Sequence, residues 1–197
     1  MKDFIDIGSS KGGSIRFAQS HFGMDGFGID IREHKVAQAV KAGYNVKHMD
    51  IFDVEEKATW VTCLHTLEHL PSRSYCYNLL KKATEIADNV YLSFPYFDSD
   101  GYLYDLGYRF FWSRWIGHTL HLTRLELHNM LTDLNVEFKI ETRGVVENTR
   151  DKAIVPLNAP VDVLGYDPET MDMKEDILLQ GVYREVRCVI GNSDFIQ

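Results

Sequence analysis

The sequence has few cysteines, few prolines and no long apolar run. Only 3 of its 197 residues are Cys and 5 are Pro. The cysteines Cys63, Cys76 and Cys188 are widely spaced and odd in number, which excludes a disulfide framework and the paired spacing of a zinc finger. Together with the absence of a signal peptide, they predict a reducing, cytoplasmic location. No apolar run approaches the roughly 20 residues that cross a bilayer, so we expect no transmembrane segment.

Basic residues are also in the minority. The chain has 21 Lys and Arg against 29 Asp and Glu, a net charge of −8, and no basic cluster. A protein held on nucleic acid by phosphate contacts needs such a cluster, so we expect no nucleic-acid partner. The 45% apolar and 25% charged residues are typical of a folded protein. The length predicts one domain over residues 1–197.

The first 95 residues alternate between strand-like and helix-like segments. Apolar runs predict strands over 4–7, 27–31, 46–49, 60–64 and 89–94. Helical periodicity predicts helices over 14–22, 33–42 and 72–87. This alternation indicates crossover units and a parallel sheet covered on both faces.

After Pro95 the alternation stops. Residues 96–121 are rich in aromatic side chains and show no clean period, which predicts an insertion that packs in the core or a dimer interface and lines part of an acceptor pocket. A helix is expected over 122–134, and strands over 136–146 and 182–190. Residues 147–180 hold three of the five prolines and are expected to be mostly loop.

A glycine-containing turn follows the first strand at residues 6–13. A P-loop needs a Lys followed by Ser or Thr after its last glycine, but Gly13 is followed by Ser14 and Ile15. The dinucleotide fingerprint fails because Ser10 stands where its second glycine belongs. The remaining pattern, Asp-x-Gly-x-x-x-Gly, suits a ligand with a cationic amino-acid end. An ordinary strand-to-helix turn is the alternative.

Three acidic residues stand at the ends of three successive predicted strands. Asp6 ends the first strand, and Asp30 follows 24 residues later at the end of the second. A carboxylate there can accept both ribose hydroxyls of a nucleoside. Asp50 ends the third strand between Met49 and Ile51, whose side chains can sandwich an adenine. Because strand ends meet at one crevice of an open sheet, the three acids predict a nucleoside site.

The segments DIGSSKGG (6–13), GIDIRE (28–33), HMDIFD (48–53), HTLEHLP (65–71) and, more weakly, HLTRLELHNML (121–131) carry a family resemblance. The sequence resembles the class I S-adenosylmethionine-dependent methyltransferases, closest to their small-molecule (type 11/12-like) branch. The resemblance implies a Rossmann-like, doubly wound α/β fold with a mostly parallel sheet of seven strands, the last antiparallel. It also implies methyl transfer from S-adenosylmethionine, with S-adenosylhomocysteine as product, to an oxygen or nitrogen of a small-molecule acceptor.

The resemblance assigns roles at the strand ends. Gly8, Ser9 and Gly12 would bracket the methionine part, with Asp6 near its amino group. Asp30 would hold the ribose, and Asp50 the adenine amino group. The full set of cofactor contacts it implies is Asp6, Gly8, Ser9, Ser10, Gly12, Asp30, Ile31, Met49, Asp50, Ile51, Leu64 and His65.

The sequence departs from the family at three places. Members commonly carry glycine where Ser10 stands, and an acidic residue at the start of the fourth strand, where this sequence has Thr59 or Trp60. Many members also have helices before the first strand that cover the cofactor. Either this cover is missing here, or residues 96–121 or a partner subunit in a homodimer replace it.

Residues 65–69 spell H-x-x-E-H, which is also an inverted zinc-protease signature. That chemistry needs both histidines on one helix face, and a preceding strand and the nearby Pro71 disfavour a helix here. The similar segment of ubiquinone-pathway O-methyltransferases places a metal at E-x-x-E-H, but His65 replaces the first Glu. We therefore expect no metal and interpret neutral His65 or His69 as a general base.

His118 and His121 flank a short stretch before the 122–134 helix. In the family this stretch faces the acceptor, so we expect His121 to join His65 and His69 as a catalytic residue; solvent-exposed loop histidines are the alternative. Two rival functions stay open. One is a methyltransferase-like fold that binds a nucleoside or a partner without catalysis. The other is a sugar- or nucleotide-modifying Rossmann enzyme, against which the failed dinucleotide spacing counts.

Overall fold

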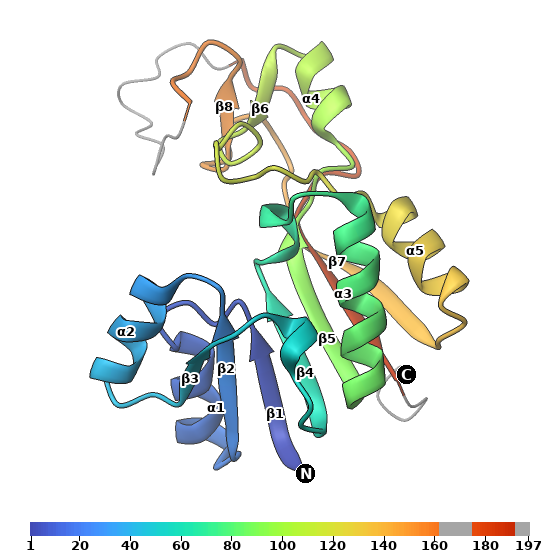
Figure 1. The fold of residues 1–197 in the computed structure, drawn as a ribbon. Helices are drawn as coiled ribbons and strands as arrows, with labels where there is room; N and C mark the ends of the chain where they lie inside the picture. Colours follow the sequence, from blue (N-terminus) through green and yellow to red (C-terminus); the bar gives the residue numbers. More distant parts are fainter. Residues whose placement is uncertain (162–174, 192–197) are drawn as a thin grey trace.

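The computed structural model describes residues 1–161 and 175–191, and its centre is a seven-stranded sheet (Figure 1). The strand order is β3-β2-β1-β4-β5-β9-β7, with parallel pairing as far as β5 and with β9 antiparallel to both neighbours. The strands are β1 (Lys2–Ile7), β2 (Gly26–Asp30), β3 (Val46–His48), β4 (Ala58–Leu64), β5 (Ala87–Pro95), β7 (Phe138–Val145) and β9 (Tyr183–Ile190). This topology confirms the expected Rossmann-like sheet with an antiparallel last strand.

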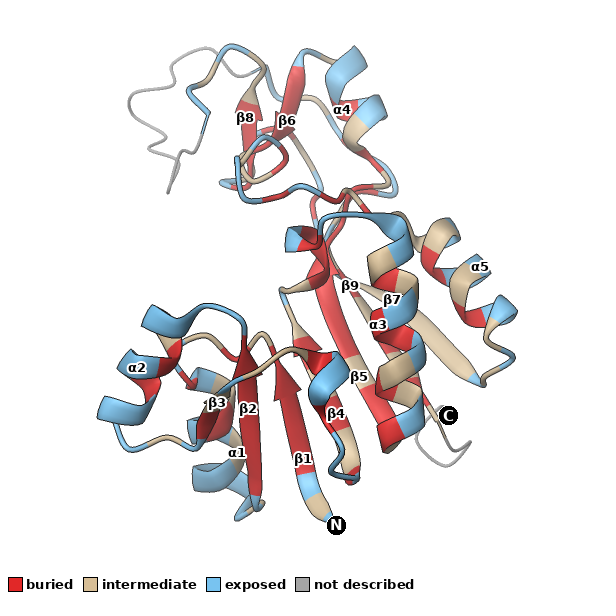
Figure 2. Cartoon of the chain, viewed as in Figure 1, coloured by how far each residue is buried: buried red, intermediate tan, exposed pale blue. Residues whose placement is uncertain are grey.

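Helices cover both faces of the sheet, because successive side chains of a strand point to opposite sides. Phe4 of β1 packs with Ile15 and Val36 from α1 and α2, whereas Ile5 joins a second apolar cluster with Leu79 of α3. The helices are α1 (Gly13–Phe22), α2 (Glu33–Lys41), α3 (Arg73–Ile86), α4 (Asp100–Asp105) and α5 (Arg124–Asp133), with one-turn 3-10 helices η1 (Ile51–Asp53) and η2 (Leu67–His69). Figure 2 shows the burial concentrated in the central strands, with the outer side of α2 exposed.

A small two-stranded sheet lies beyond the carboxyl end of β5 (Figure 1). Its strands, β6 (Tyr108–Phe110) and β8 (Ile154–Pro156), pair antiparallel, and α4 packs against β6. We call residues 96–121 and 147–161 the projecting unit. The guanidinium of Arg109, 4% exposed, ties it together by donating to the carbonyls of residues 110, 111, 159 and 160.

The elements predicted for the central sheet and its helices are confirmed to within two residues at each end. The projecting unit differs from expectation. The 96–121 segment contains α4 and β6. The described part of 147–180 is mostly loop, as expected, apart from β8. Strands of three residues are too short to show a period, and each forms only because a distant segment pairs with it. Residues 162–174 lie outside the described part, and the division into domains stays a prediction.

No helix within the described ranges is long and apolar enough to cross a membrane.

Candidate functional site

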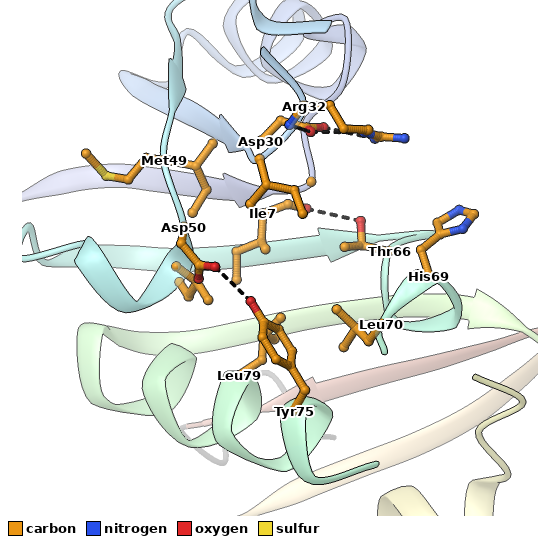
Figure 3. Close-up of a pocket in the computed structure, with 14 residues that line it drawn as sticks. Ile7, Asp30, Arg32, Met49, Asp50, Thr66, His69, Leu70, Tyr75 and Leu79 are labelled. Carbon is orange, nitrogen blue, oxygen red and sulfur yellow. Dashed lines mark hydrogen bonds and ion pairs between the residues drawn. The ribbon is translucent and has the colours of Figure 1, made fainter. Parts of the chain in front are cut away.

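A cavity of about 220 Å³ lies at the carboxyl ends of β1, β2 and β3 (Figure 3). Six of the residues expected to bind a cofactor line it, namely Gly8, Asp30, Ile31, Met49, Asp50 and Ile51. They meet because parallel strands end at the same edge of the sheet. The positions of these residues at the ends of successive predicted strands therefore correctly predicted that they lie together in the structure.

Asp30 lies at one end of this cavity and is almost fully hydrogen-bonded. Its carboxylate accepts from the backbone N–H of Ser10 at 2.9 Å, and from the backbone N–H, Nε and Nη2 of Arg32 at 2.8 to 3.0 Å. Burial alone would raise the pKa of Asp30, but the bonds from Arg32 and Ser10 outweigh it and hold the pKa below its ordinary value. Asp30 is therefore a fixed anion.

Asp50 lies at the adjoining strand end. Its carboxylate accepts from the hydroxyl of Tyr75 at 2.8 Å and from the backbone N–H of Phe52 at 3.2 Å, which caps η1. Burial, followed by the bond to Asp50, raises the pKa of Tyr75 to about 12, so this hydroxyl stays protonated. Apolar side chains separate the two acids (Figure 3), which gives the cavity two polar ends and an apolar middle.

The turn after β1 is shaped by packing against the chain itself. Gly8 has φ +71°, and a Cβ there would lie 2.3 Å from Oγ1 of Thr66, which also lines the cavity. Gly12 has φ +81°, and its Cβ would lie 2.8 Å from the ring of Tyr44. Both glycines are required because neighbouring segments approach the turn closely.

Asp6 is buried below this turn and does not line the cavity. Its carboxylate accepts hydrogen bonds from the hydroxyls of Ser14 and Thr62. Burial outweighs these two bonds and raises the pKa of Asp6 to about 6. Asp6 thus connects β1 to α1 and β4, and a role beside the cofactor stays a prediction.

A second cavity, of about 330 Å³, adjoins the first, and His69 lines both. Its walls come from η2, from the projecting unit and from β9. They are formed by His65, Glu68, His69, Pro95, Trp112, Trp115, His118, Arg184 and Glu185. Two indoles and three imidazoles therefore face a space beside the apolar middle of the first cavity.

Three imidazoles surround the buried Glu68. Nδ1 of His65 lies 3.4 Å from Oε1 of Glu68, and that contact raises the pKa of His65. His69 donates from Nδ1 to the carbonyl of Gly117 at 2.6 Å, so its Nε2 carries the lone pair. The ring of His118 packs edge-on to that of His69, with centroids 5.0 Å apart. The H-x-x-E-H motif spans a strand end and η2, which excludes the helical zinc-protease arrangement.

His121 is held outside both cavities. Its ring stacks on Phe97 at a centroid distance of 4.3 Å, and its Nδ1 lies 3.3 Å from Oδ2 of Asp100. The structure therefore brings His65 and His69 to one cavity but does not bring His121 with them.

The comparisons with solved structures agree on one architecture. One similar structure is a SAM-dependent methyltransferase from Archaeoglobus fulgidus. The alignment covers 97% of this chain and 86% of that protein, with a TM-score of 0.65 and 17% sequence identity. Another is the magnesium protoporphyrin IX methyltransferase of Synechocystis PCC 6803, solved with bound SAH. The alignment covers 97% of this chain and 74% of that protein, with a TM-score of 0.57 and 18% sequence identity. A third is the plantazolicin methyltransferase in complex with SAH. The alignment covers 97% of this chain and 76% of that protein, with a TM-score of 0.59 and 15% sequence identity.

The chain has the class I SAM-dependent methyltransferase fold. No protein-family model matches the sequence, and no curated protein matches it either.

The other residues expected to bind the cofactor of a class I methyltransferase lie around the first cavity without lining it. Ser9 is buried with its hydroxyl toward the carbonyl of Ile29, and Ser10 acts through its backbone N–H. Gly12 and Leu64 do not line the cavity, and His65 lines the second one instead. Their roles as cofactor contacts stay predictions.

Sequence reasoning missed several residues that line the first cavity of this methyltransferase fold. They are Ile7, Ile29, Arg32, Thr66, Leu70, Tyr75 and Leu79. Arg32 directly follows the strand that ends in Asp30, so a signal for it existed. Tyr75 and Leu79 come from α3, and only the packing of that helix on the sheet shows that they reach this cavity, where Tyr75 bonds to Asp50.

Proposed function

We propose that this chain transfers a methyl group from S-adenosylmethionine to an oxygen or nitrogen of a small-molecule acceptor. The observation that carries the proposal is the pair of adjoining cavities that share His69. One has a carboxylate at each polar end and an apolar middle, and the other is lined by imidazoles and indoles.

The first cavity fits the cofactor. Asp30 would accept the ribose hydroxyls, and Asp50, with Met49 and Ile51, would hold the adenine. The turn at Gly8 would face the methionine part. When bound, S-adenosylmethionine supplies an electrophilic methyl carbon, whose bond to sulfur breaks as the acceptor's lone pair forms the new bond.

Asp30 also shows what must change on binding. Its two oxygens already accept four hydrogen bonds, of which two come from the side chain of Arg32. That side chain is 46% exposed, so it borders solvent. Two ribose hydroxyls would replace exactly those two donors while the backbone donors of Ser10 and Arg32 stay in place.

The second cavity would hold the acceptor, and His65 would take its proton. Glu68 lies against Nδ1 of His65 and orients the ring, so that Nε2 is left to accept the proton. Trp112 and Trp115 offer flat apolar surface for an acceptor with an apolar or aromatic face. The protein's part in the reaction is alignment of donor and acceptor and removal of one proton.

Isothermal titration with S-adenosylhomocysteine tests the proposal. We expect wild type to bind it and Asp30→Ala to bind at least about tenfold more weakly, because hydrogen bonds to a charged group are lost. The matched control is Asp105→Ala, an exposed aspartate at the end of α4, which should bind like wild type. Absence of wild-type binding, or equal binding by Asp30→Ala, overturns the proposal.

Catalysis needs a second measurement. Transfer of a labelled methyl group to small molecules of a cell extract should occur with wild type and stop in Asp30→Ala. Binding of S-adenosylhomocysteine without any transfer would instead support a non-catalytic cofactor-binding module.

A further inference from the structure

Three buried side-chain atoms of residues that line the second cavity have no hydrogen-bond partner among the described residues, namely Oε2 of Glu68, Nδ1 of His118 and Nε1 of Trp112. The indole N–H of Trp112 can only donate, so Glu68 and His118 are the two that offer lone pairs. Glu68 is 1% exposed and His118 is 9% exposed. An unsatisfied buried polar group costs about 1–3 kcal/mol, so three at one place call for an explanation.

The side chains of Glu68 and His118 lie together with that of His69. One ligand atom each of Glu68, His69 and His118 lies within 4.8 Å of the other two. His69 donates from Nδ1 to the carbonyl of Gly117, which leaves Nε2 as a lone pair. Metal-binding histidines are held in this manner, with the second ring nitrogen donating to a carbonyl.

Glu68 keeps one carboxylate oxygen, Oε2, without a partner inside the described chain. The other oxygen of Glu68 is the one that contacts His65, so Oε2 is left for the cluster.

We propose that Glu68, His69 and His118 together bind a borderline divalent transition-metal ion, Zn²⁺, at the wall of the second cavity. Two imidazoles and one carboxylate are the protein ligands of a catalytic zinc, which keeps an open position for a further ligand. A hard ion such as Mg²⁺ prefers oxygen ligands, which this cluster does not supply in number. Residues 65–69 alone do not form this site, because His118 comes from the projecting unit and His65 stays outside it.

The open position would face the acceptor. This part of the inference rests on the proposed methyl transfer, whereas zinc binding does not. An acceptor hydroxyl bound to the ion would lose its proton more readily, because a bound cation lowers the pKa of an attached oxygen acid. The proton would pass to His65, and the oxygen lone pair would attack the methyl carbon.

Zinc titration of the metal-free protein tests the site. After treatment with a chelator, Zn²⁺ alone is titrated by calorimetry, with no cofactor present. We expect wild type to bind one equivalent, and Glu68→Gln and His118→Ala to bind at least about a hundredfold more weakly, since each lacks one of the proposed protein ligands. His121→Ala, in the same loop but outside the cluster, is the matched control and should bind like wild type.

Thermal unfolding keeps the result interpretable if a variant folds poorly. Zn²⁺ should raise the Tm of wild type and of His121→Ala, and should leave the Tm of folded Glu68→Gln and His118→Ala unchanged. No saturable binding by wild type, or unchanged affinity in both ligand variants, overturns the site. The zinc titration contains no S-adenosylhomocysteine, so the two proposals are tested separately. Absence of zinc binding would not contradict the proposed methyl transfer, and absence of S-adenosylhomocysteine binding would not contradict the zinc site.

Discussion

The two cavities share His69 but are built in different ways. The first is formed mainly by consecutive strand ends of β1, β2 and β3, with the start of α3 closing one side. The second is formed by η2, a loop of the projecting unit and the first residues of β9, which are far apart in the sequence. The first cavity therefore follows from a rule of sheet topology, whereas the second depends on how separate segments pack.

This difference separates general binding from specific chemistry. Strand ends that always meet at one edge suit a ligand shared by many proteins of the fold. Loops packed from distant segments vary freely, and they suit the acceptor that distinguishes one enzyme from another. If this division holds, changes in one cavity should leave the function of the other intact.

The largest expected effect is on catalysis. His65→Gln should lower the rate of the proposed methyl transfer by about 10²–10⁴-fold, because the residue that we propose as general base is removed. The same variant should bind S-adenosylhomocysteine like wild type, since His65 lines the second cavity and not the first. Single-turnover transfer and calorimetry measure the two effects. His34→Gln, an exposed histidine on α2, serves as control. A parallel loss of cofactor affinity would contradict the division between cavities.

The next effect concerns stability and pH below the first cavity. The pKa of Asp6 is about 6 in the folded chain and 3.8 ordinarily, so between these values the folded state holds more protons than the unfolded state. Stability should therefore fall as pH rises from about 4 to about 6 and level off above, by about 3 kcal/mol from this group. Asp6→Asn should lack this contribution.

Urea unfolding of wild type and Asp6→Asn at several pH values measures it. As pH rises from about 4 to about 6, the unfolding free energy of wild type should fall relative to that of Asp6→Asn. If the difference in unfolding free energy between wild type and Asp6→Asn stays the same from pH 4 to pH 7, the pKa of Asp6 is not raised in the folded chain.

The smallest effect is at the end of the first cavity that holds Asp30, where we propose that the ribose binds. Arg32→Ala should bind S-adenosylhomocysteine up to about fivefold more tightly, because a half-exposed ion pair worth at most about 1 kcal/mol no longer competes for Asp30. Arg16→Ala, on the exposed side of α1, should change nothing. Calorimetry decides; weaker binding by Arg32→Ala would mean that the guanidinium contacts the ligand.

Much of the first cavity could be predicted from the sequence, because its information is local. Asp30 and Asp50 each stand at or directly after the end of a predicted strand, and the parallel topology brings the ends of these strands together. The position of Asp6 could not be predicted in the same way. Whether its carboxylate points into the cavity or toward Ser14 depends on strand pleating and on the hydroxyl of Thr62, a neighbour 56 residues away.

The second cavity was predicted only in part. The histidine-containing segment after β4 was recognised, but nothing near His118 in the sequence shows that it packs on His69 rather than facing solvent. His121 was the more prominent candidate because it begins a segment that resembles the family, yet its ring stacks on Phe97. The positions of His118 and His121 depend on the pairing of short strands such as β6 and β8. Three residues are too few to show an alternation of apolar and polar side chains, so the sequence does not predict which strand pairs with which.

In the part of the chain that the structure describes, four connections join the central sheet and its helices to the segments beyond the carboxyl end of β5, namely after β5, before α5, after β7 and before β9. Within the described residues the loop before α5 is also bonded to η2, through Leu120 and Glu68 and through Thr119 and Leu70. A body joined by a single passage swings about a hinge, but one joined by four resists rotation. We therefore expect the opening of the second cavity to have a nearly constant width, controlled by rotation of individual side chains and not by closure of one part of the molecule over another.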